Sequence, residues 1–578
     1  MDIKQVTPFL SVTPQITEAD ISVLKSMGFQ TIINNRPDGE EDRQPASDTL
    51  KAAAETHGIA YFHQPIVPGK MSDDDVARFA ETLKQVQGPV LAFCRTGTRA
   101  ISLWALSEAW HMSPSRLLET AKGAGYDLSG LADRLGALSS VHHAPEHQSV
   151  TSARARFDVV IVGGGAGGIS VASGILKRDP DLDIALIEPR DSHYYQPGWT
   201  LVGGGVFDRR MTEKPMADVM TRGVQWVRTA AAGFEPEDNA VVLEDGERLF
   251  YRALIVAPGI KLDWDKIEGL GETLGKNGVT SNYLYGMAPY TWELVQGLKS
   301  GRALFTQPPM PIKCAGAPQK AMYLACDHWR RQGVLDDIDV GFHNAGGVLF
   351  GVKDYVPALQ SYVERYGIGL NFNRNLTAVD GPARTAHFIE TDGEGNKRSV
   401  SESFDMLHVV PPQCAPDFVR NSALAGDSGF VEVGHETLRH TRFGNVFSLG
   451  DACSAPNAKT AAAVRKQAPV VAENVVAVLE GKTPRAVYDG YGSCPLTVER
   501  GKIVLAEFGY GGKLLPTFPT WMVDGTKPSS LSWFLKEKML PAIYWRLMLK
   551  GHEWLAAPQH LPQESAGFEA LDAVEPHK

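Results

Sequence analysis

Short apolar runs alternate with helical stretches through the first 136 residues of the chain. The apolar runs are short, as in buried strands, and the stretches between them have the three- and four-residue spacing of amphipathic helices. Because strands that alternate with helices form parallel sheets, we expect a small α/β domain over residues 1–136. Its expected strands are 31–34, 60–63 and 90–93, and its expected helices are 17–27, 46–57, 72–87 and 98–110.

A polar stretch at 137–156 has no apolar period and predicts a linker. A second alternation occupies residues 157–490 and predicts a larger α/β body. The remainder divides into a region that mixes aromatic with basic side chains, 491–560, and a flexible tail, 561–578. The expected strands of the body are 157–162, 184–187, 253–257, 302–306, 338–342 and 446–449.

Composition narrows the classes of function. The 578-residue chain has a net charge of −10, and an acidic chain lacks the basic face that nucleic-acid binding needs. Six cysteines are too few for a disulfide scaffold, so those that matter are expected to act through their reactivity. We predict no metal site, since the histidines of the linker, His142, His143 and His147, are typical of a solvated segment.

A glycine-rich motif opens the second body. Gly163, Gly165 and Gly168 have the G-x-G-x-x-G spacing, directly between a predicted strand and a predicted helix. Glu188 ends the next strand, about 20 positions later, where an acid that binds a ribose belongs. Such glycines let the backbone approach a pyrophosphate at a helix N-terminus, so the motif predicts a bound dinucleotide.

Later motifs favour FAD as that dinucleotide. Ala257 and Gly259 stand at a strand end, as in flavoproteins that hold two dinucleotides, and Gly450 and Asp451 end a later strand where a short acid can hold the ribityl chain. A helix that begins near Thr460 would direct its positive end at the flavin. The place for a second, NAD(P)H-binding fingerprint holds prolines and a cysteine instead, so a nicotinamide donor is not expected.

Further motifs occur in a fixed order along this body. They are the segments 193–201 (HYYQPGWTL), 314–320 (CAGAPQK), 459–463 (KTAAA) and 493–496 (SCPL). From about residue 157 to 559 the chain therefore resembles the sulfide:quinone oxidoreductases of the mitochondrial-like type. The resemblance implies a flavoprotein with two Rossmann-like subdomains, FAD as cofactor, sulfide as electron donor and quinone as acceptor. It also adds Lys459 and Thr460 to the expected cofactor-binding residues.

The resemblance implies a redox-active cysteine pair, in which hydrosulfide attacks a disulfide and leaves one persulfide and one thiolate. Cys314 matches the family's first cysteine. The family's second cysteine usually follows the Gly-Asp pair directly, whereas Cys453 stands one position later here. We expect Cys453 to be the partner, with Cys414 as the alternative and the lack of a working pair as a third possibility. Structural roles are expected for Cys326 and Cys494.

The region before the tail predicts a membrane contact. Apolar and aromatic residues between Leu531 and Leu549 are interspersed with lysines and arginines, and Pro541 interrupts them. The uncharged runs are too short to span a bilayer, so short helices in a membrane interface are expected, with an arm packed on the body as the alternative. Since quinones reside in lipid and the chain shows no secretory signal, we expect a peripheral enzyme on the cytoplasmic face of the inner membrane.

The N-terminal domain contains a cysteine loop between a strand and a helix. In the segment 94–99 (CRTGTR), backbone N–H groups would surround an anion, with Arg99 across from Cys94. A tyrosine-phosphatase loop has one residue more between cysteine and arginine, and the smaller ring suits a persulfide sulfur, as in rhodaneses. With its segment 32–39 (IINNRPDG), the domain resembles a small bacterial family of phosphatase-like fold often labelled sulfurtransferase. We expect Cys94 to accept sulfane sulfur and pass it to a small thiol or a protein.

The favoured hypothesis is thus an FAD-dependent sulfide oxidase that reduces quinone, fused to a sulfur-carrying domain. A second hypothesis is a protein-phosphatase-like or phospho-ligand-binding module tethered to a flavoprotein redox sensor. A third, a quinone reductase driven by NAD(P)H, is disfavoured by the missing second fingerprint.

Overall fold

The structure is a computed structural model that describes residues 1–562 except 8, 87, 110–113, 136–155 and 457. Two compact units make up the chain, residues 1–153 and 154–578. The linker predicted at 137–156 and the tail predicted at 561–578 lie almost wholly outside the described residues.

The first unit is built on a five-stranded sheet of order β1-β2-β5-β3-β4, in which β1 and β2 are antiparallel and the other neighbours are parallel. The strands are β1 (Lys4–Gln5), β2 (Leu10–Thr13), β3 (Thr31–Asn34), β4 (Ala60–His63) and β5 (Val90–Phe93). The helices are α1 (Glu18–Ser26), α2 (Ser47–Thr56), α3 (Asp73–Gln85), α4 (Thr98–Glu108) and α5 (Pro114–Gly123).

The central strands of this sheet are buried on both faces. Every residue of β3 and β5 is buried, as parallel strands between two helix layers require. Ile33 and Ala92 belong to one apolar cluster, whereas their neighbours Ile32 and Leu91 belong to another. The alternation of side chains along each strand therefore builds one core on each face of the sheet. The predicted α/β class is confirmed.

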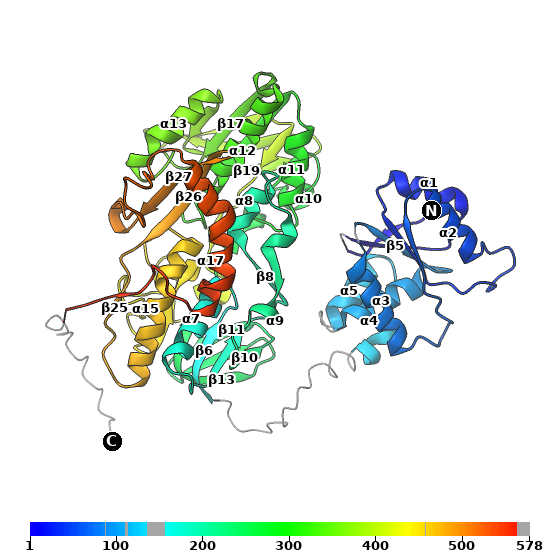
Figure 1. Ribbon diagram of the computed structural model, residues 1–578, viewed down its shortest axis with the longest axis horizontal. Helices are drawn as coiled ribbons and strands as arrows, with labels where there is room; N and C mark the ends of the chain where they lie inside the picture. The colour runs from blue at the N-terminus through cyan, green and yellow to red at the C-terminus, as the bar shows by residue number, and fades with distance from the viewer. Residues whose placement is uncertain (8, 87, 110–113, 136–155, 457, 563–578) are drawn as a thin grey trace. The chain divides into compact units, whose positions relative to one another are not determined.

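The second unit, the flavoprotein body, contains two main sheets, each with its own helices (Figure 1). Its first sheet has the order β10-β7-β6-β13-β12-β11, and β24 pairs with β13. All neighbours are parallel except at β11 and β12, which join as antiparallel strands. The strands are β6 (Arg156–Val162), β7 (Ile184–Ile187), β10 (Val224–Val227), β11 (Ala231–Glu235), β12 (Ala240–Leu243), β13 (Arg248–Val256) and β24 (Val446–Ser448). The helices α7 (Ala166–Arg178) and α15 (Ala461–Leu479) pack against each other.

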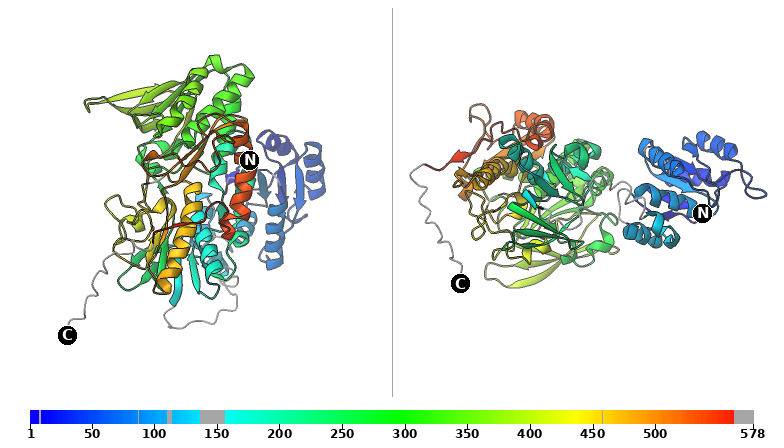
Figure 2. Two further views of the ribbon diagram at one scale, coloured as in Figure 1. Left: turned by 60° about the vertical axis from the view of Figure 1, so that its left-hand side comes forward. Right: turned by 90° about the horizontal axis from the view of Figure 1, so that it is seen from below.

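The second sheet of the body is entirely parallel, in the order β15-β22-β16-β17-β18. Its strands are β15 (Val279–Thr280), β16 (Gly301–Gln307), β17 (Ile338–Asn344), β18 (Gly369–Phe372) and β22 (Met406–His408). The accompanying helices are α11 (Ala288–Gly297), α12 (Ala317–Gln332) and α13 (Val356–Arg365). An antiparallel sheet projects at the upper left of the left-hand view in Figure 2, formed by β19 (Arg374–Asp380), β20 (Thr385–Thr391) and β21 (Lys397–Ser403).

A hairpin and a C-terminal arm complete the body. The hairpin consists of β26 (Gly492–Glu499) and β27 (Lys502–Phe508), and it packs against α12. The arm is shown in red in Figure 1 and contains α16 (Ser530–Phe534), a π-helical turn (Leu535–Met539) and α17 (Leu540–Arg546). It ends in β28 (Gln559–His560), which pairs with β25 (Ala486–Val487). No helix among the described residues is both long and apolar enough to cross a bilayer.

Candidate functional site

One cavity of about 340 Å³ collects the residues that the sequence assigned to a dinucleotide. It lies where the first sheet, the second sheet and the C-terminal arm meet. The predicted residues that line it are Gly163, Gly165, Glu188, Ala257, Gly259, Gly450, Asp451, Lys459 and Thr460. The structure therefore brings together chain segments almost 300 residues apart.

The glycines shape the phosphate-binding end of this cavity. A Cβ atom on Gly168 would lie 1.8 Å from the carbonyl oxygen of Gly163, so only glycine fits at this position of the turn. At Gly165 a Cβ would meet nothing within 4 Å, which leaves open space at the N-terminus of α7. Glu188 ends β7, and its Oε2 accepts the Gly164 N–H at 2.8 Å. This open turn against a helix N-terminus fits a pyrophosphate.

Polar atoms without partners line the same cavity. Trp199 Nε1, Thr200 Oγ1 and both polar atoms of the Asn282 amide are buried and have no hydrogen-bond partner among the described residues. Buried polar groups are almost always hydrogen-bonded in folded proteins. These donors and acceptors therefore fit a ligand rich in heteroatoms, such as a flavin ring.

The residues expected beside the ribityl chain and the flavin ring, Asp451 and Thr460, also line the cavity. Burial raises the pKa of Asp451, and Lys459 Nζ holds its loop by donating to the Asp451 carbonyl at 2.8 Å. Thr460 is the N-cap of α15, with its Oγ1 accepting the Ala463 N–H at 3.2 Å. The positive end of α15 is thus directed at the cavity.

The C-terminal arm closes one side of the site. Tyr544 of α17 contacts His193 of β8 (Ser192–Tyr194), with 2.6 Å between Tyr544 Oη and His193 Nε2. His193 Nδ1 lies 3.1 Å from the Gly164 carbonyl, which can only accept, so Nδ1 carries the proton and Nε2 accepts from Tyr544. Burial lowers the pKa of His193 to about 4, so the ring is neutral at physiological pH.

Cys314 and Cys494 lie close together beside this cavity. Their Sγ atoms are 4.0 Å apart, and both thiols are free. Cys314 lies just before α12, and Cys494 lies on β26. A Cβ on Gly316 would come within 2.5 Å of Cys494 Sγ, so a glycine two residues after Cys314 lets the hairpin approach.

A buried lysine sits against both sulfurs. Lys320, on the first turn of α12, is 2% exposed, and its Nζ is 3.1 Å from Cys314 Sγ and 3.8 Å from Cys494 Sγ. The Cys494 S–H group and the Lys320 ammonium hold the pKa of Cys314 well below its usual range. The pKa of Cys494 is raised instead, because its proton is shared with Cys314. Cys314 is therefore the thiolate of the pair.

A second lysine reaches this cluster from the C-terminal arm. Lys536 is 3% exposed within the π-helical turn, and its Nζ donates to the Pro197 carbonyl at 3.4 Å. Burial lowers the pKa of Lys536 to about 7, and the nearby Lys320 charge adds to that effect. The arm thus supplies part of the charge around the two sulfurs.

The sequence predicted that Cys453 lies beside Cys314, but the structure does not place it there. Cys453 is fully buried in the core of the first sheet, where its thiol donates to the Gly450 carbonyl at 3.3 Å and burial raises its pKa. Cys414, the alternative, lies on the short strand β23 (Gln413–Cys414), paired with β14 (Lys261–Leu262). The sequence analysis assigned Cys494 of the SCPL motif a structural role, because Cys494 is 180 residues from Cys314 and no local pattern indicates that the two thiols meet.

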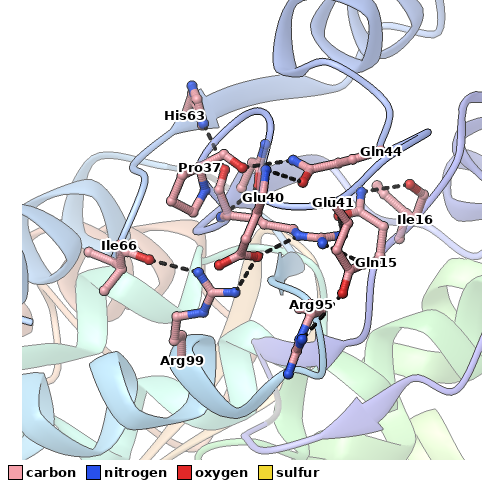
Figure 3. Close-up of polar contacts among 12 residues, drawn as sticks. Gln15, Ile16, Pro37, Glu40, Glu41, Gln44, His63, Ile66, Arg95 and Arg99 are labelled. Carbon is pink, nitrogen blue, oxygen red and sulfur yellow. Dashed lines mark hydrogen bonds and ion pairs between the residues drawn. The ribbon is translucent and has the colours of Figure 1, made fainter. Parts of the chain in front are cut away.

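The cysteine loop of the first unit is surrounded by an ion-pair network (Figure 3). Cys94 is 1% exposed at the end of β5. Arg99 donates to the Ile66 carbonyl at 2.7 Å and to Glu40 at 2.8 Å, and the same Glu40 oxygen accepts from Arg36 at 2.7 Å. Arg99 is therefore already paired with a carboxylate, and its expected role toward an anion at Cys94 stays a prediction.

The carboxylates of this network are ionised. Hydrogen bonding by Arg99 lowers the pKa of Glu40, and hydrogen bonding by Arg36 lowers that of Glu41. Glu41 also pairs with Arg95 at 3.2 Å. Hydrogen bonds from arginines thus favour the ionised forms of both carboxyl groups, whereas the general acid of a phosphatase has to be protonated. Among the residues that the structure describes, no cluster of histidine, cysteine or acidic side chains is suited to a metal ion.

Two family models match the chain. Residues 2–111 match the phosphatase-like domain of the beta-lactamase hydrolase-like protein, and residues 157–285 match the pyridine nucleotide-disulphide oxidoreductase family. These matches confirm the phosphatase-like fold of the first unit and the FAD-binding flavoprotein fold of the body.

Relatives of known name match most of the body. The mitochondrial sulfide:quinone oxidoreductase of Dictyostelium discoideum is 44% identical over 396 residues, 68% of this chain and 86% of the relative. That of Mus musculus is 38% identical over 69% of this chain and 88% of the relative. The crystal structure of the sulfide:quinone oxidoreductase from Aquifex aeolicus shares the fold, with a TM-score of 0.57 at 19% identity over 69% of this chain and 92% of that chain. Through its FAD-binding body, the chain belongs to the sulfide:quinone oxidoreductase family.

Proposed function

We propose that the body oxidises sulfide to sulfane sulfur at Cys314 and Cys494 and delivers the electrons to quinone. The observation that carries this proposal is the 4.0 Å approach of the two sulfurs around the Lys320 ammonium. The pair replaces Cys314 and Cys453, the pair expected from the sequence. The relatives are named for sulfide and quinone, which supports the same two substrates here.

The pKa difference between the cysteines assigns their roles. In the disulfide form, hydrosulfide attacks Cys494 Sγ, a new S–S bond forms there, and the Cys314–Cys494 bond breaks. Cys314 leaves as the thiolate because a thiol of lower pKa is the better leaving group. Cys494 then holds the persulfide, and Cys314, which lines the cavity, faces the cofactor. FAD, when bound, accepts the two electrons and passes them on to quinone.

Lysines stabilise the negative charge of each sulfur species. Lys320 contacts both Sγ atoms, and Lys536, whose pKa of about 7 leaves it partly protonated near neutral pH, lies on the side of the arm. An acceptor thiolate or another anion attacks the outer sulfur of the Cys494 persulfide, and a Cys494 thiolate leaves. Cys314 and Cys494 then lose two electrons as the disulfide re-forms, and these are the two electrons that FAD would accept. The proposed sulfur acceptor is a small thiol or a protein thiol such as Cys94.

We further propose that the arm docks on a membrane, on the cytoplasmic face of the inner membrane. Lys536, Tyr544 and Leu549 of the arm are buried against the body. On this inner side the arm packs as the alternative hypothesis expected. The arm exposes Leu531 and Phe534, which is 52% exposed, and Trp521 in the segment between β27 and α16 is 82% exposed. Aromatic residues at the surface, together with lysines, are typical of interfacial helices.

For the first unit we propose that Cys94 carries sulfane sulfur. The five-stranded fold presents Cys94 at the N-terminus of α4, and the six-residue loop is one residue shorter than that of tyrosine phosphatases. The shorter loop is the feature that supports transfer chemistry over dephosphorylation, and the arginines around Glu40 and Glu41 favour the ionised forms of these two carboxyl groups.

Replacing either member of the proposed pair is expected to stop turnover. Cys314→Ser and Cys494→Ser should each slow the anaerobic bleaching of the flavin by sulfide by at least about 100-fold, because neither variant can form the disulfide. Absorbance near the flavin maximum in a stopped-flow instrument reports this rate. The matched controls Cys453→Ser and Cys414→Ser should retain rates close to wild type. An inactive Cys453→Ser with an active Cys494→Ser would restore the pairing expected from the sequence.

Removing the buried ammonium is expected to shift the titration of Cys314. In Lys320→Met the pKa of Cys314 should rise by about 1–3 pH units, since an opposite charge at this distance favours the ionised form. The thiolate that is present at neutral pH in the wild type would then appear only at higher pH. Alkylation of Cys314 by iodoacetamide across pH 5–10, followed by mass spectrometry, measures the midpoint. Lys538→Met, whose side chain is 62% exposed, is the control; an unshifted midpoint in Lys320→Met would contradict the assignment.

The exposed side of the arm is expected to bind lipid. The double variant Trp521→Ser, Phe534→Ser should weaken binding to anionic vesicles by at least about tenfold, because each large apolar side chain contributes about 1.5–3 kcal/mol when buried. Vesicle sedimentation at increasing lipid concentration gives the affinity. Val348→Ser, which removes a side chain that is 61% exposed outside the arm, should change nothing. Equal binding of both variants would leave the arm as a purely structural element.

Cys94 is expected to take up sulfur in the intact protein. After incubation with a polysulfide, the peptide that contains Cys94 should gain the mass of one sulfur atom, and cyanide should remove it. Cys94→Ser should leave sulfide-dependent bleaching of the flavin unchanged and abolish this transfer. Hydrolysis of an aryl phosphate that depends on Cys94, without uptake of sulfur, would instead support the phosphatase-like hypothesis.

A further inference from the structure

Glu507 is a buried acid on the wall of the cofactor cavity. Its side chain is 5% exposed on β27, opposite Ser493 of β26. The Tyr491 hydroxyl donates to Glu507 Oε1 at 2.6 Å, and the Thr517 N–H donates to Oε2 at 3.2 Å. The Thr517 hydroxyl also donates to Oε1, and the Lys466 ammonium is near enough to interact with the Glu507 charge. Glutamates are rarely so buried unless they are paired, and Glu507 forms no ion pair within 4 Å in the described part of the chain.

The β26–β27 hairpin has two chemically different faces. Cys494 and its cross-strand partner Ala506 point into the core of the second sheet, beside Cys314 and Lys320. The alternate residues of the same strands line the cavity instead. They are Ser493, Pro495, Leu505 and Glu507. The period-two alternation of strands thus places the sulfur chemistry on one face and Glu507 on the other.

The wall around Glu507 is apolar and continues to the C-terminal arm. Leu505 and Phe518 line it on the side of the hairpin, and Leu535 and Leu540 line it on the side of the arm. The arm exposes Phe534 beside these residues. These residues offer an apolar chain a surface to lie on, while Arg465 and Lys536 line the same cavity.

The other carboxylates of the cavity already have assignments. Three acidic residues line it: Glu188, Asp451 and Glu507. Glu188 accepts the N–H groups of Gly164 and Arg190 at the phosphate end. Asp451 follows Gly450 at the place expected for the ribityl chain. Glu507 is left as the one carboxyl group on the cavity wall without a role in holding the cofactor.

We propose that Glu507 is the proton donor for quinone reduction. A quinone takes up two electrons and two protons to become a quinol, and the proposed oxidation of sulfide supplies the electrons. Glu507 transfers a proton from its carboxyl group to a quinone carbonyl oxygen, an O–H bond breaks and another forms, and water reprotonates the carboxylate before the second transfer. Tyr491 and Thr517 are positioning residues that fix the carboxyl group. This assignment rests on quinone being the acceptor in the proposed function.

The test compares acceptors that need protons with one that does not. Enzyme reduced anaerobically with sulfide is mixed with a short-chain ubiquinone or with ferricenium, which takes electrons alone. In Glu507→Gln, reoxidation by the quinone should slow by about 100-fold, the scale of a lost general acid, and reoxidation by ferricenium should keep its wild-type rate. Glu507→Asp should recover part of the quinone rate. The affinity of the oxidised enzyme for the quinone, measured by quenching of tryptophan fluorescence, should stay close to wild type.

Glu537→Gln is the matched control, because Glu537 lies on the arm and bonds Trp533 and Lys538 rather than the cavity. It should react with both acceptors at wild-type rates. Equal rates for Glu507→Gln and wild type with quinone, or an equal slowing with both acceptors, would overturn the assignment of Glu507 alone. Wild-type enzyme that sulfide reduces but no quinone reoxidises would overturn the proposed acceptor, and with it this role.

Discussion

The contact between the buried Lys320 ammonium and the Cys314 sulfur constrains the rest of the active site. An ammonium that is 2% exposed is tolerated only when an anion compensates it, and breaking such a pair costs about 3–5 kcal/mol. The contact therefore favours a thiolate at Cys314, and it leaves the shared proton on Cys494. Cys314 lies just before α12 and Lys320 lies in the first turn of this helix, so the local sequence already encodes the thiol and its counter-charge. The β26 strand brings the second sulfur from about 180 residues away.

The hairpin and the arm each contribute residues both to this sulfur cluster and to the cofactor cavity. Because neighbouring residues of a strand point to opposite faces, Cys494 faces the buried lysine while Ser493 and its partner Glu507 face the cavity. The arm contributes Lys536 to the sulfur side and Tyr544 to the cofactor side, and it exposes Leu531 and Phe534 together with Lys538. Docking of the arm and assembly of the site are thus parts of one packing arrangement.

Local sequence predicted the fold well where a motif and its element are contiguous. The alternation of apolar runs located β3, β4 and β5, and the glycine motif located the cavity, because each depends on residues within one strand–turn–helix unit. The approach of Cys494 to Cys314 was not predictable in this way. Cys453 stands two residues after the Gly-Asp pair, but its thiol points into the core toward the Gly450 carbonyl. Cys494 comes close to Cys314 only through the three-dimensional path of β26. Glu507 and Glu40 were missed for the same reason, since their significance comes from neighbours distant in sequence.

The pairing of Cys314 with Cys494 is the central claim, and a disulfide map of the oxidised protein tests it most directly. The intact protein is oxidised with a stoichiometric amount of polysulfide, alkylated under acidic conditions, digested without reductant and analysed by mass spectrometry. The account predicts a linked peptide pair that contains Cys314 and Cys494, joined by two sulfur atoms or by a chain with additional sulfur. A linkage from Cys314 to Cys453 or Cys414, with Cys494 recovered as a free alkylated thiol, would contradict it.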